Sequence, residues 1–296
     1  MEKQETFIPR QPLTIIQGVP FIKNFADGWA KVESFMARPD DLLICTYPKA
    51  GTTWISEIVD CILNNGDLEK TKRSAIYTRV PFLEFASPAF SSGIELLVNA
   101  ESPRVIKTHL PVKLLPKTIW KNNCKIIYVA RNAKDVAVSY YYFYKMALVH
   151  PDPGSWDEFL EKYITGEVAY GSWYEHVKGW WEKRKDHSIL YLLYEDMKED
   201  PKREIRKVMQ FMEKELGEET LERINHHTTF KEMKDNVMTN YKAIPKWRMD
   251  QNASTFMRKG ATGDWKNHFS VAQNEKFDEV YERSMAGSLL RFRTEI

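Results

Sequence analysis

Hydrophobic residues follow two alternating patterns through the first two thirds of this 296-residue chain. Short apolar runs predict buried strands at 42–46, 104–108, 125–130 and 189–194. Recurrence of apolar residues at three- and four-residue intervals predicts helices at 53–64, 133–147, 156–165, 173–185, 202–213 and 218–226. Strands that alternate with helices favour a mostly parallel sheet covered by helices on both faces. The expected fold class is therefore α/β.

The chain shows no linker or change of composition that would divide it, so we expect a single domain over residues 1–296. Residues 233–263 differ from the rest because they lack periodicity and mix basic, aromatic and amide side chains. A long irregular segment within a compact domain is usually functional or mobile.

Composition and charge exclude several classes of protein. Apolar residues make up 43% of the chain, and 43 basic residues balance 41 acidic ones to leave a net charge of +2. Such a balance gives no overall attraction to nucleic acid or to an anionic membrane, so an anion site must be local. The N-terminal residues lack the apolar core of a signal peptide, and no 18-residue apolar run occurs. We therefore expect a cytoplasmic protein.

The three cysteines are Cys45, Cys61 and Cys124. They lie in or beside apolar runs and do not have the spacing of metal ligands, which predicts buried free thiols. We expect no metal.

The octet Tyr47–Trp54 (YPKAGTTW) follows the first predicted strand and opens a predicted helix. A strand, a small turn and a helix N-terminus together present backbone N–H groups to a phosphate. In the nucleotide P-loop G-x-x-x-x-G-K-[ST] the lysine follows the second glycine. Here Lys49 precedes Gly51, the octet's only glycine, which predicts a phosphate site that works without magnesium and does not bind ordinary ATP.

Further polar residues stand at the carboxyl ends of the predicted strands, where ligands bind to open parallel sheets. These residues are Lys49, Lys107, His109, Arg131 and Tyr194. We expect the fold to bring them together. Histidine has a pKa near neutrality, so His109 is a candidate base for an acceptor hydroxyl. With seven histidines in the chain, a purely structural role is the common alternative.

Two further groups could bind an anion. Arg131 ends a strand and Ser139 lies two turns into the next helix, so both could contact phosphate oxygens. Residues 256–263 (FMRKGATG) combine Arg258 and Lys259 with glycines that allow close approach. Each has a plainer interpretation, as a surface ion pair or a charged turn. Together with the octet they suggest a ligand with phosphates at both ends.

Aromatic residues at 81–85 and 140–144 are candidates for an apolar pocket, although many must belong to the core. Trp54 could stack on a purine or simply pack in the interior. Two alternative functions remain open at this point. A nucleotide kinase would also bind phosphate in a turn that follows a strand. A non-catalytic nucleotide-binding module would keep Arg131 and Arg258 but would not need His109 and Lys107.

Five motifs in this order resemble the cytosolic sulfotransferases, and the resemblance covers nearly the whole chain. The motifs are 47–54, KTHLP at 107–111, YVARNAKDVAVSYY at 128–141, YEDMKEDP at 194–201 and RKGATGDWKNHF at 258–269. The sequence of residues 147–156 is most similar to that of the phenol-type branch. The resemblance implies transfer of a sulfuryl group from 3′-phosphoadenosine 5′-phosphosulfate (PAPS) to a small phenolic acceptor, leaving 3′,5′-adenosine bisphosphate (PAP).

The resemblance also implies roles for individual residues. His109 would be the general base, with Lys49, Lys107 and Ser139 as the other catalytic residues. The donor would be held by Lys49, Gly51, Thr52, Thr53, Trp54, Arg131, Ser139, Tyr194, Thr228, Phe230, Met233, Phe256, Met257, Arg258, Lys259 and Gly260. The acceptor would be lined by Phe82, Phe85, Lys107, His109, Phe143, Ala147, Val149 and Tyr241. No metal would be needed, because lysines and backbone dipoles can neutralise the developing charge.

A homodimer through Lys266–Glu275 is implied as well, with no nucleic-acid or membrane partner. The chain departs from the family's pattern at Ala50, Thr255 and Ser270. The basic triplet Lys246-Trp247-Arg248 would border the acceptor site and could alter which acceptors enter. Steroids, iodothyronines and aryl amines therefore stay open as acceptors beside simple phenols.

Overall fold

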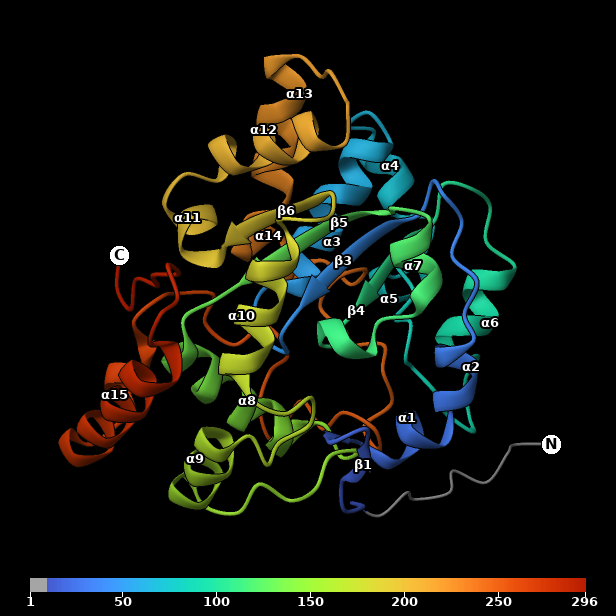
Figure 1. The fold of residues 1–296 in the computed structure, drawn as a ribbon. Helices are drawn as coiled ribbons and strands as arrows, with labels where there is room; N and C mark the ends of the chain where they lie inside the picture. Colours follow the sequence, from blue (N-terminus) through green and yellow to red (C-terminus); the bar gives the residue numbers. More distant parts are fainter. Residues whose placement is uncertain (1–9) are drawn as a thin grey trace.

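The centre of the molecule is a four-stranded parallel sheet with the order β4-β3-β5-β6 (Figure 1). A computed structural model describes residues 10–296. The strands are β3 (Leu42–Thr46), β4 (Val105–Thr108), β5 (Lys125–Ala130) and β6 (Ile189–Leu193). All four predicted strands are confirmed, with β4 starting one residue later and β6 ending one residue earlier than expected.

Alternation along the strands builds two separate cores, because successive side chains of a strand point to opposite faces. Leu43 and Cys45 of β3 belong to the core on one face, and Leu42 and Ile44 belong to the core on the other. Both sets are buried, so β3 reads as a continuous apolar run. The three cysteines are free and buried, as predicted.

The six predicted helices are present, with ends that differ from the expected ones by at most two residues. They are α3 (Thr52–Leu63), α8 (Ala133–Met146), α9 (Trp156–Thr165), α10 (Trp173–Lys183), α12 (Pro201–Phe211) and α13 (Glu218–His227). Helices α3, α12 and α13 pack on one another on one side of the sheet, while α8, α9 and α10 lie on the other side (Figure 1). The sheet is thus covered on both faces.

Other elements were not predicted. They are the hairpin of β1 (Thr14–Ile16) and β2 (Val19–Phe21), the short helices α1 (Lys23–Asp27), α2 (Trp29–Glu33), α4 (Leu68–Thr71), α5 (Ile76–Arg79), α6 (Gly93–Val98), α7 (Lys117–Lys121), α11 (Tyr194–Glu199) and α14 (Phe230–Asp235), the 3₁₀ helices η1 (Val112–Leu114) and η2 (Asp264–Asn267), and α15 (Val271–Met285). Helix α15 is long but buries only Phe277 and Met285, so its apolar periodicity is weak. The segment 233–263 was expected to be irregular, but its first three residues belong to α14. Residues 236–263 contain no helix or strand beyond a single bridge at Met249, as expected.

The strand order places a switch point between β3 and β5. The chain leaves β3 toward β4 on one side and returns to β5 on the other, so the connections diverge at the carboxyl ends of β3 and β5. Ligands of open α/β sheets bind in the crevice that this divergence leaves.

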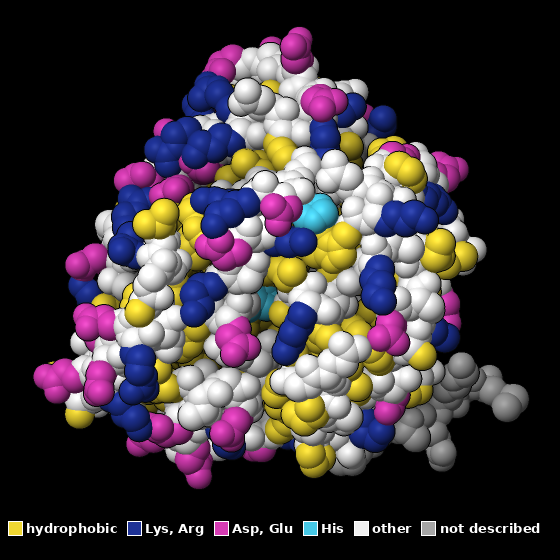
Figure 2. All heavy atoms as spheres, in the orientation of Figure 1, with side chains coloured by type: hydrophobic (Ala, Val, Ile, Leu, Met, Phe, Trp, Pro, Cys, Tyr) yellow, Lys and Arg dark blue, Asp and Glu magenta, His cyan; other side chains and the backbone are white. Residues whose placement is uncertain are grey.

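Charged side chains do not gather on the face shown in Figure 2, where basic and acidic groups are interspersed. In the described part of the chain, no helix has the length and apolar character needed to cross a membrane.

Candidate active site

A cavity of about 300 Å³ opens at the carboxyl ends of the strands. Every residue that the sequence singled out for donor, acceptor or chemistry lines this cavity: Lys49, Gly51, Thr52, Thr53, Trp54, Phe82, Phe85, Lys107, His109, Arg131, Ser139, Phe143, Ala147, Val149, Tyr194, Thr228, Phe230, Met233, Tyr241, Phe256, Met257, Arg258, Lys259 and Gly260. Strand ends far apart in sequence therefore converge on one site.

The turn between β3 and α3 leaves backbone N–H groups free at the helix N-terminus. Gly51 is the N-cap of α3 with φ of 102°, and no side chain caps the helix. A Cβ on Gly51 would lie 2.9 Å from the Tyr194 ring, so glycine is needed both for conformation and for space. The Thr52 hydroxyl lies 2.7 Å from that of Thr46 at the end of β3. This arrangement suits a phosphate.

Lys49 projects into the cavity between two aromatic rings. Its Nζ lies 4.6 Å from the ring centre of Phe143 and 4.5 Å from that of Phe256. Burial, together with the nearby Arg131 and Arg258, lowers the pKa of Lys49 to about 7. An anion bound beside Lys49 would reverse the repulsion from the arginines and keep the ammonium protonated.

His109 is held in one tautomer by the end of β3. Its Nδ1 lies 2.8 Å from the backbone carbonyl oxygen of Thr46. A carbonyl oxygen only accepts hydrogen bonds, so Nδ1 carries the ring proton and Nε2 keeps a free lone pair. Burial lowers the pKa of His109 to about 3, opposed by the Thr46 contact and helped by nearby cations such as Lys107. His109 is therefore neutral near pH 7, with the Nε2 lone pair unprotonated.

A buried carboxylate holds the backbone of His109. Glu84 Oε1 accepts from the His109 N–H at 2.7 Å, and Oε2 accepts from the Thr108 hydroxyl at 2.8 Å. Burial raises the pKa of Glu84 to about 7 despite these hydrogen bonds. On the other side, His176 Nε2 lies 3.0 Å from the carbonyl oxygen of His109. His109 is thus held by its neighbours on both sides.

Lys107 reaches the cavity from β4 and donates to the Tyr241 hydroxyl at 3.2 Å. Tyr241 stacks on Phe256 with ring centres 4.0 Å apart. Lys107 is only 6% exposed. The irregular segment thus contributes directly to the position of a buried cation beside His109.

The second cationic group is assembled from Arg131, in the turn between β5 and α8, and from the segment after residue 255. Arg131 donates to the carbonyl oxygens of Lys49 at 3.3 Å and Ala261 at 2.8 Å. Arg258 pairs with Asp264 at 2.6 Å, and Lys259 pairs with the other oxygen of the same carboxylate. Although burial opposes ionisation, hydrogen bonds from Lys259, Asn267 and Arg258 hold the pKa of Asp264 well below its usual range. Neither arginine lies on the open surface, contrary to the plainer interpretation.

Gly260 allows this segment to approach α14 closely. Its φ is 63°, and a Cβ there would lie 2.1 Å from the Phe230 ring. A glycine is therefore required where the segment that carries Arg258 and Lys259 packs against the Phe230 ring.

Trp54 and Tyr194 form an edge-to-face pair with ring centres 5.5 Å apart, and Arg131 lies 4.3 Å from the centre of the Tyr194 ring. Trp54 Nε1 is buried without a hydrogen-bond partner. The ring thus has an unsatisfied donor at the cavity, which pure core packing would not leave.

The other end of the cavity is apolar. Phe82, Phe85, Phe143, Ala147 and Val149 line it, and Phe82 packs against His109 with ring centres 4.9 Å apart. Of the run 140–144, only Tyr140 and Phe143 face the cavity, as the helical geometry required. This end of the cavity is suited to a flat apolar group lying between the rings, beside His109.

Comparison with known proteins confirms the family that the sequence motifs resemble. Residues 39–289 match the protein family described as "Sulfotransferase domain". The chain is 61% identical over 287 residues to sulfotransferase 1 family member D1 of Rattus norvegicus and 59% identical over 287 residues to sulfotransferase 1A1 of Bos taurus, with 97% of each chain covered in both cases.

The chain belongs to the cytosolic sulfotransferases. Among solved structures, mouse sulfotransferase SULT7A1 complexed with PAP is 32% identical, with a TM-score of 0.77 over 93% of this chain and 95% of that one. A retinol dehydratase solved with retinol and PAP has a TM-score of 0.83 over 93% of this chain and 90% of that one, at 24% identity, which supports the fold alone. This sulfotransferase uses PAPS to sulfate the hydroxyl groups of small acceptors.

The cavity of this sulfotransferase fits a donor with phosphates at two ends. The uncapped α3 N-terminus lies near Lys49, while Arg131 and Arg258 each have a buried Nε without a partner. Unsatisfied buried donors of this kind need an acceptor, and phosphate oxygens are suitable ones. The close approach at Gly260 adds backbone to the same site.

Sequence reasoning did not single out the lining residues Ile22, Phe25, His150, Tyr170, Lys198 and Met249. It named Pro48, Tyr140, Arg248 and Ala261 only within longer candidate segments. Lys198 lies four residues after Tyr194 on α11, so helical spacing could have found it. Ile22 and Phe25 come from the N-terminal elements, for which the sequence carried no signal. Arg248 was expected only to border the site.

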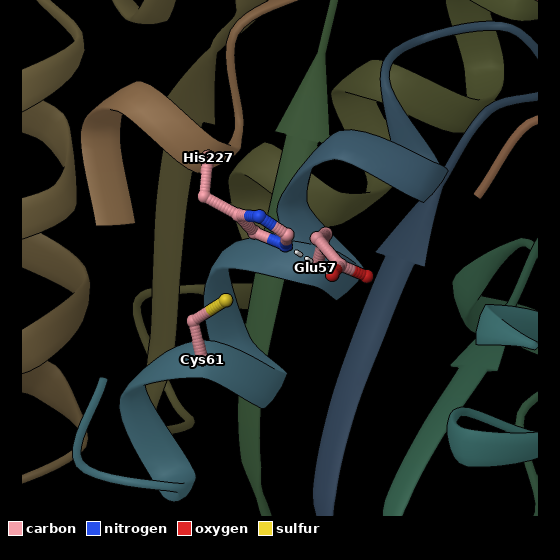
Figure 3. Close-up of side chains that lie close together, drawn as sticks. All are labelled: Glu57, Cys61 and His227. Carbon is pink, nitrogen blue, oxygen red and sulfur yellow. Dashed lines mark hydrogen bonds and ion pairs between the residues drawn. The ribbon is translucent and has the colours of Figure 1, made fainter. Parts of the chain in front are cut away.

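A second cluster of polar side chains lies on α3, below the turn between β3 and α3 that could bind phosphate (the phosphate turn). Glu57 and Cys61 lie on successive turns of α3, and His227 reaches them from the end of α13 (Figure 3). Their ligand atoms lie within 4.8 Å of one another, which is compatible with a metal ion. However, Glu57 is already paired with Arg79 at 2.7 Å and with His227 at 2.8 Å. These contacts make the cluster a buried ion-pair network, and the sequence-based expectation that no metal is bound stays a prediction.

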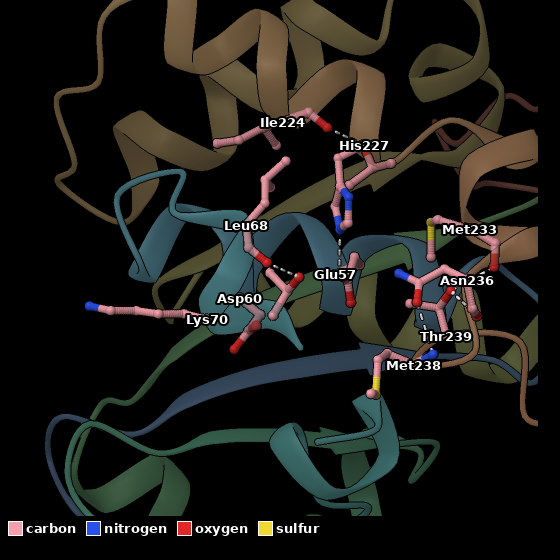
Figure 4. A network of polar contacts seen from close by, with 12 residues as sticks. Glu57, Asp60, Leu68, Lys70, Ile224, His227, Met233, Asn236, Met238 and Thr239 are labelled. Atoms are coloured by element: carbon pink, nitrogen blue, oxygen red, sulfur yellow. Dashed lines mark hydrogen bonds and ion pairs between the residues drawn. The ribbon is translucent and has the colours of Figure 1, made fainter. Parts of the chain in front are cut away.

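This network ties α3 to its neighbours. The His227–Glu57 contact joins α13 to α3 (Figure 4), and Arg79 joins α5 to Asp60 of the same helix. Figure 4 also contains the start of the irregular segment, where the Thr239 hydroxyl donates to the Met233 carbonyl oxygen at 2.6 Å. The helix that presents the phosphate turn is therefore held on both flanks.

Proposed function

We propose that this sulfotransferase acts on small phenols with His109 as the general base. The observation that carries the proposal is the 2.8 Å contact between His109 Nδ1 and the Thr46 carbonyl oxygen, which leaves Nε2 free to accept a proton. Phenols have a pKa near that of tyrosine, about 10, so they need a proton acceptor during transfer rather than full prior ionisation.

In the proposed step, the acceptor oxygen forms a bond to sulfur while the bond from sulfur to the bridging phosphate oxygen of PAPS breaks. The acceptor proton passes to His109 Nε2, and PAP leaves. Lys49 neutralises charge on the departing oxygen, and Lys107 neutralises charge on the sulfuryl oxygens. Preorganised cations in a site that excludes water are effective in this role. Ser139 lines the cavity beside them.

For the donor, we assign the 5′ end to the N-terminus of α3, with Lys49, Gly51, Thr52 and Thr53. The 3′-phosphate is assigned to Arg131, Ser139, Arg258, Lys259 and Gly260. The remaining donor residues surround the adenine: Trp54, Tyr194, Thr228, Phe230, Met233, Phe256 and Met257. The unpaired Nε atoms of Arg131 and Arg258 and the unpaired Nε1 of Trp54 support this division.

For the acceptor, we assign Phe82, Phe85, Phe143, Ala147, Val149 and Tyr241. The aromatic walls and the edge-to-face contact of Phe82 with His109 favour a planar ring over an alkyl alcohol. The phenolic class of the acceptor rests on this apolar lining.

The experiment that tests the proposal is calorimetric binding of PAP, 5′-AMP and ATP without magnesium. We expect PAP to bind far more tightly than AMP, and Arg258→Ala to remove most of that difference while leaving AMP affinity unchanged. Sulfation of 4-nitrophenol in the presence of a chelator should continue. Equal affinity for PAP and AMP, or a preference for ATP with magnesium, would overturn the donor assignment and favour a kinase.

We also propose a homodimer through Lys266–Glu275. Support comes from the exposure of this segment: Val271, at the start of α15, has 77% of its surface exposed. The Ser270 hydroxyl and the Gln273 side chain form a capping box that fixes the helix start, so serine here preserves the local geometry.

A further inference from the structure

One arginine at the acceptor end of the cavity has no acidic partner. Arg248 is only 6% exposed and lines the cavity. The other buried arginines of the described chain are Arg79, Arg104 and Arg131. Each has a carboxylate within 4.0 Å, on Glu57 and Asp60, on Asp41, and on Asp135 respectively. Within residues 10–296, Arg248 is the exception.

The surroundings of Arg248 hold its guanidinium in place without neutralising it. Nη1 donates to the Ser87 hydroxyl at 2.9 Å, and the group lies 4.7 Å from the ring centre of Phe85. The nearby acid, Asp250, faces Lys246 instead. Burial alone lowers the pKa of Arg248 to about 10. A buried cation without a counterion is costly, so its retention points to a ligand.

The position of Arg248 is on the acceptor side rather than at either phosphate site. Its carbonyl oxygen accepts from the N–H of Leu148 at 2.9 Å, and Met249 forms a bridge with Ala147. Both contacts tie it to the segment 147–149, whose residues Ala147 and Val149 line the apolar end. The phosphate sites use other cations, so the charge of Arg248 is not needed for the donor.

The lining of the cavity carries no negative charge that would oppose an anion beside Arg248. Its cations are Lys49, Lys107, Arg131, Lys198, Arg248, Arg258 and Lys259, and no carboxylate lies among the lining residues. The Ser87 contact occupies Nη1, which leaves Nε and Nη2 on one edge of the guanidinium. A carboxylate can accept from both at once.

We propose that Arg248 recognises a carboxylate on the acceptor, and that this enzyme prefers phenols carrying a carboxylate remote from the reacting hydroxyl. The inference rests on the proposed phenol sulfation and adds the class of phenol. The aromatic walls hold the ring, His109 meets the hydroxyl at one end and Arg248 meets the carboxylate at the other.

The test compares 3-(4-hydroxyphenyl)propanoate with its amide, 3-(4-hydroxyphenyl)propanamide. The two have the same shape, and the intervening methylenes keep the phenol pKa nearly equal. We expect kcat/KM to favour the carboxylate by about tenfold or more, mostly through KM, because a charge-assisted hydrogen bond contributes to binding far from the hydroxyl. Shorter and longer acids of the same series then measure the distance between His109 and Arg248 that the acceptor has to span.

The variant Arg248→Met should bring the carboxylate-to-amide ratio of kcat/KM close to one, and Arg248→Lys should retain part of the preference. Lys246→Met is the matched control, since it removes a charge from the same segment at an exposed position. It should keep the full preference. PAP affinity of each variant verifies that the donor site is folded.

A parental enzyme that sulfates the amide as well as the carboxylate would overturn the inference, as would an Arg248→Met variant that loses both substrates equally. A neutral phenol such as 4-nitrophenol separates this failure from that of the proposed function. If 4-nitrophenol is sulfated but the carboxylate is not preferred, only the role of Arg248 is wrong. If no phenol is sulfated, the proposed function fails and this inference fails with it.

Discussion

His109 and Thr46 are joined by a hydrogen bond from the imidazole Nδ1 to a backbone carbonyl oxygen 2.8 Å away. Thr46 is the last residue of β3, and its hydroxyl also contacts Thr52 at the start of α3. The same strand end therefore orients the proposed base and supports the turn to which we assign the 5′ end of the donor. A shift of β3 would disturb both together.

Lys49 should be the most reactive lysine of the free protein near neutral pH. Its pKa of about 7 leaves a large neutral fraction at pH 7.5, whereas an ordinary lysine near pKa 10.4 has less than about 1%. Limiting acetic anhydride followed by peptide mass spectrometry should label Lys49 faster than exposed Lys246. PAP should protect it, because phosphate raises the lysine pKa and covers the amine. Labelling no faster than at Lys246 would contradict the shifted pKa.

Gly260→Ala should weaken PAP binding and lower thermal stability. The new Cβ would meet the Phe230 ring at 2.1 Å, on a backbone with positive φ. Strain of this kind costs about 1–3 kcal/mol. Gly217→Ala is the matched control, because no atom lies within 4 Å of its Cβ and its φ is −67°. Calorimetry measures PAP affinity and thermal unfolding measures stability for the two variants. Equal PAP affinity and equal stability would show that the close approach of Gly260 to Phe230 is not required.

Acid should destabilise the protein through its buried histidines. Burial lowers the pKa values of His109, His150 and His176 to about 3, 3 and 4, while the unfolded chain titrates near 6.5. The unfolded state therefore binds more protons, and stability falls as the pH drops below about 6.5. Glu84, with a pKa of about 7, holds a proton in the folded state between about pH 4.5 and 7 and offsets one histidine.

The net slope should be about 3 kcal/mol per pH unit between about pH 6 and 4.5, from two uncompensated histidines. Denaturant unfolding across this range measures it. His150→Leu should reduce the slope by about 1.4 kcal/mol per unit, whereas His226→Gln, at an exposed position, should leave it unchanged. A stability independent of pH in this range would show that these histidines titrate normally.

The proposed dimer should depend on Val271. Placing a charge at this exposed apolar residue with Val271→Glu should convert a dimer into a monomer in sedimentation velocity at micromolar concentration. Leu289→Glu is the control, because Leu289 is 81% exposed but lies outside Lys266–Glu275. A monomeric parental protein would contradict the dimer. A Val271→Glu variant that stays dimeric would show that the interface lies elsewhere.

The strands were predictable from short apolar runs and the main helices from their periodicity, and the parallel-sheet rule then predicted the site at the strand ends. That rule predicts that Lys49, His109 and Arg131 lie together, and all three line the cavity. The missed elements lack such signals. Helix α15 buries few residues, and the hairpin of β1 and β2 is only three residues long on each side.

Residues of the cavity were missed for a related reason. His150 and Tyr170 enter through loops, and their packing against the cavity depends on tertiary contacts rather than on local pattern. Arg248 is instructive, because the sequence indicated a basic triplet near the site but not which member turns inward. Lys246 is exposed and Arg248 is buried, a difference set by the pairing of Arg248 with Leu148.

The measurement that tests the account most directly is the turnover of His109→Ala with 4-nitrophenol, made beside its affinity for PAP. The account predicts a loss of about a hundred- to ten-thousand-fold in kcat, since this is the usual contribution of a general base. PAP affinity should stay at the parental value, because the donor is held by other residues. A variant that turns over at close to the parental rate at neutral pH would remove His109 from the mechanism.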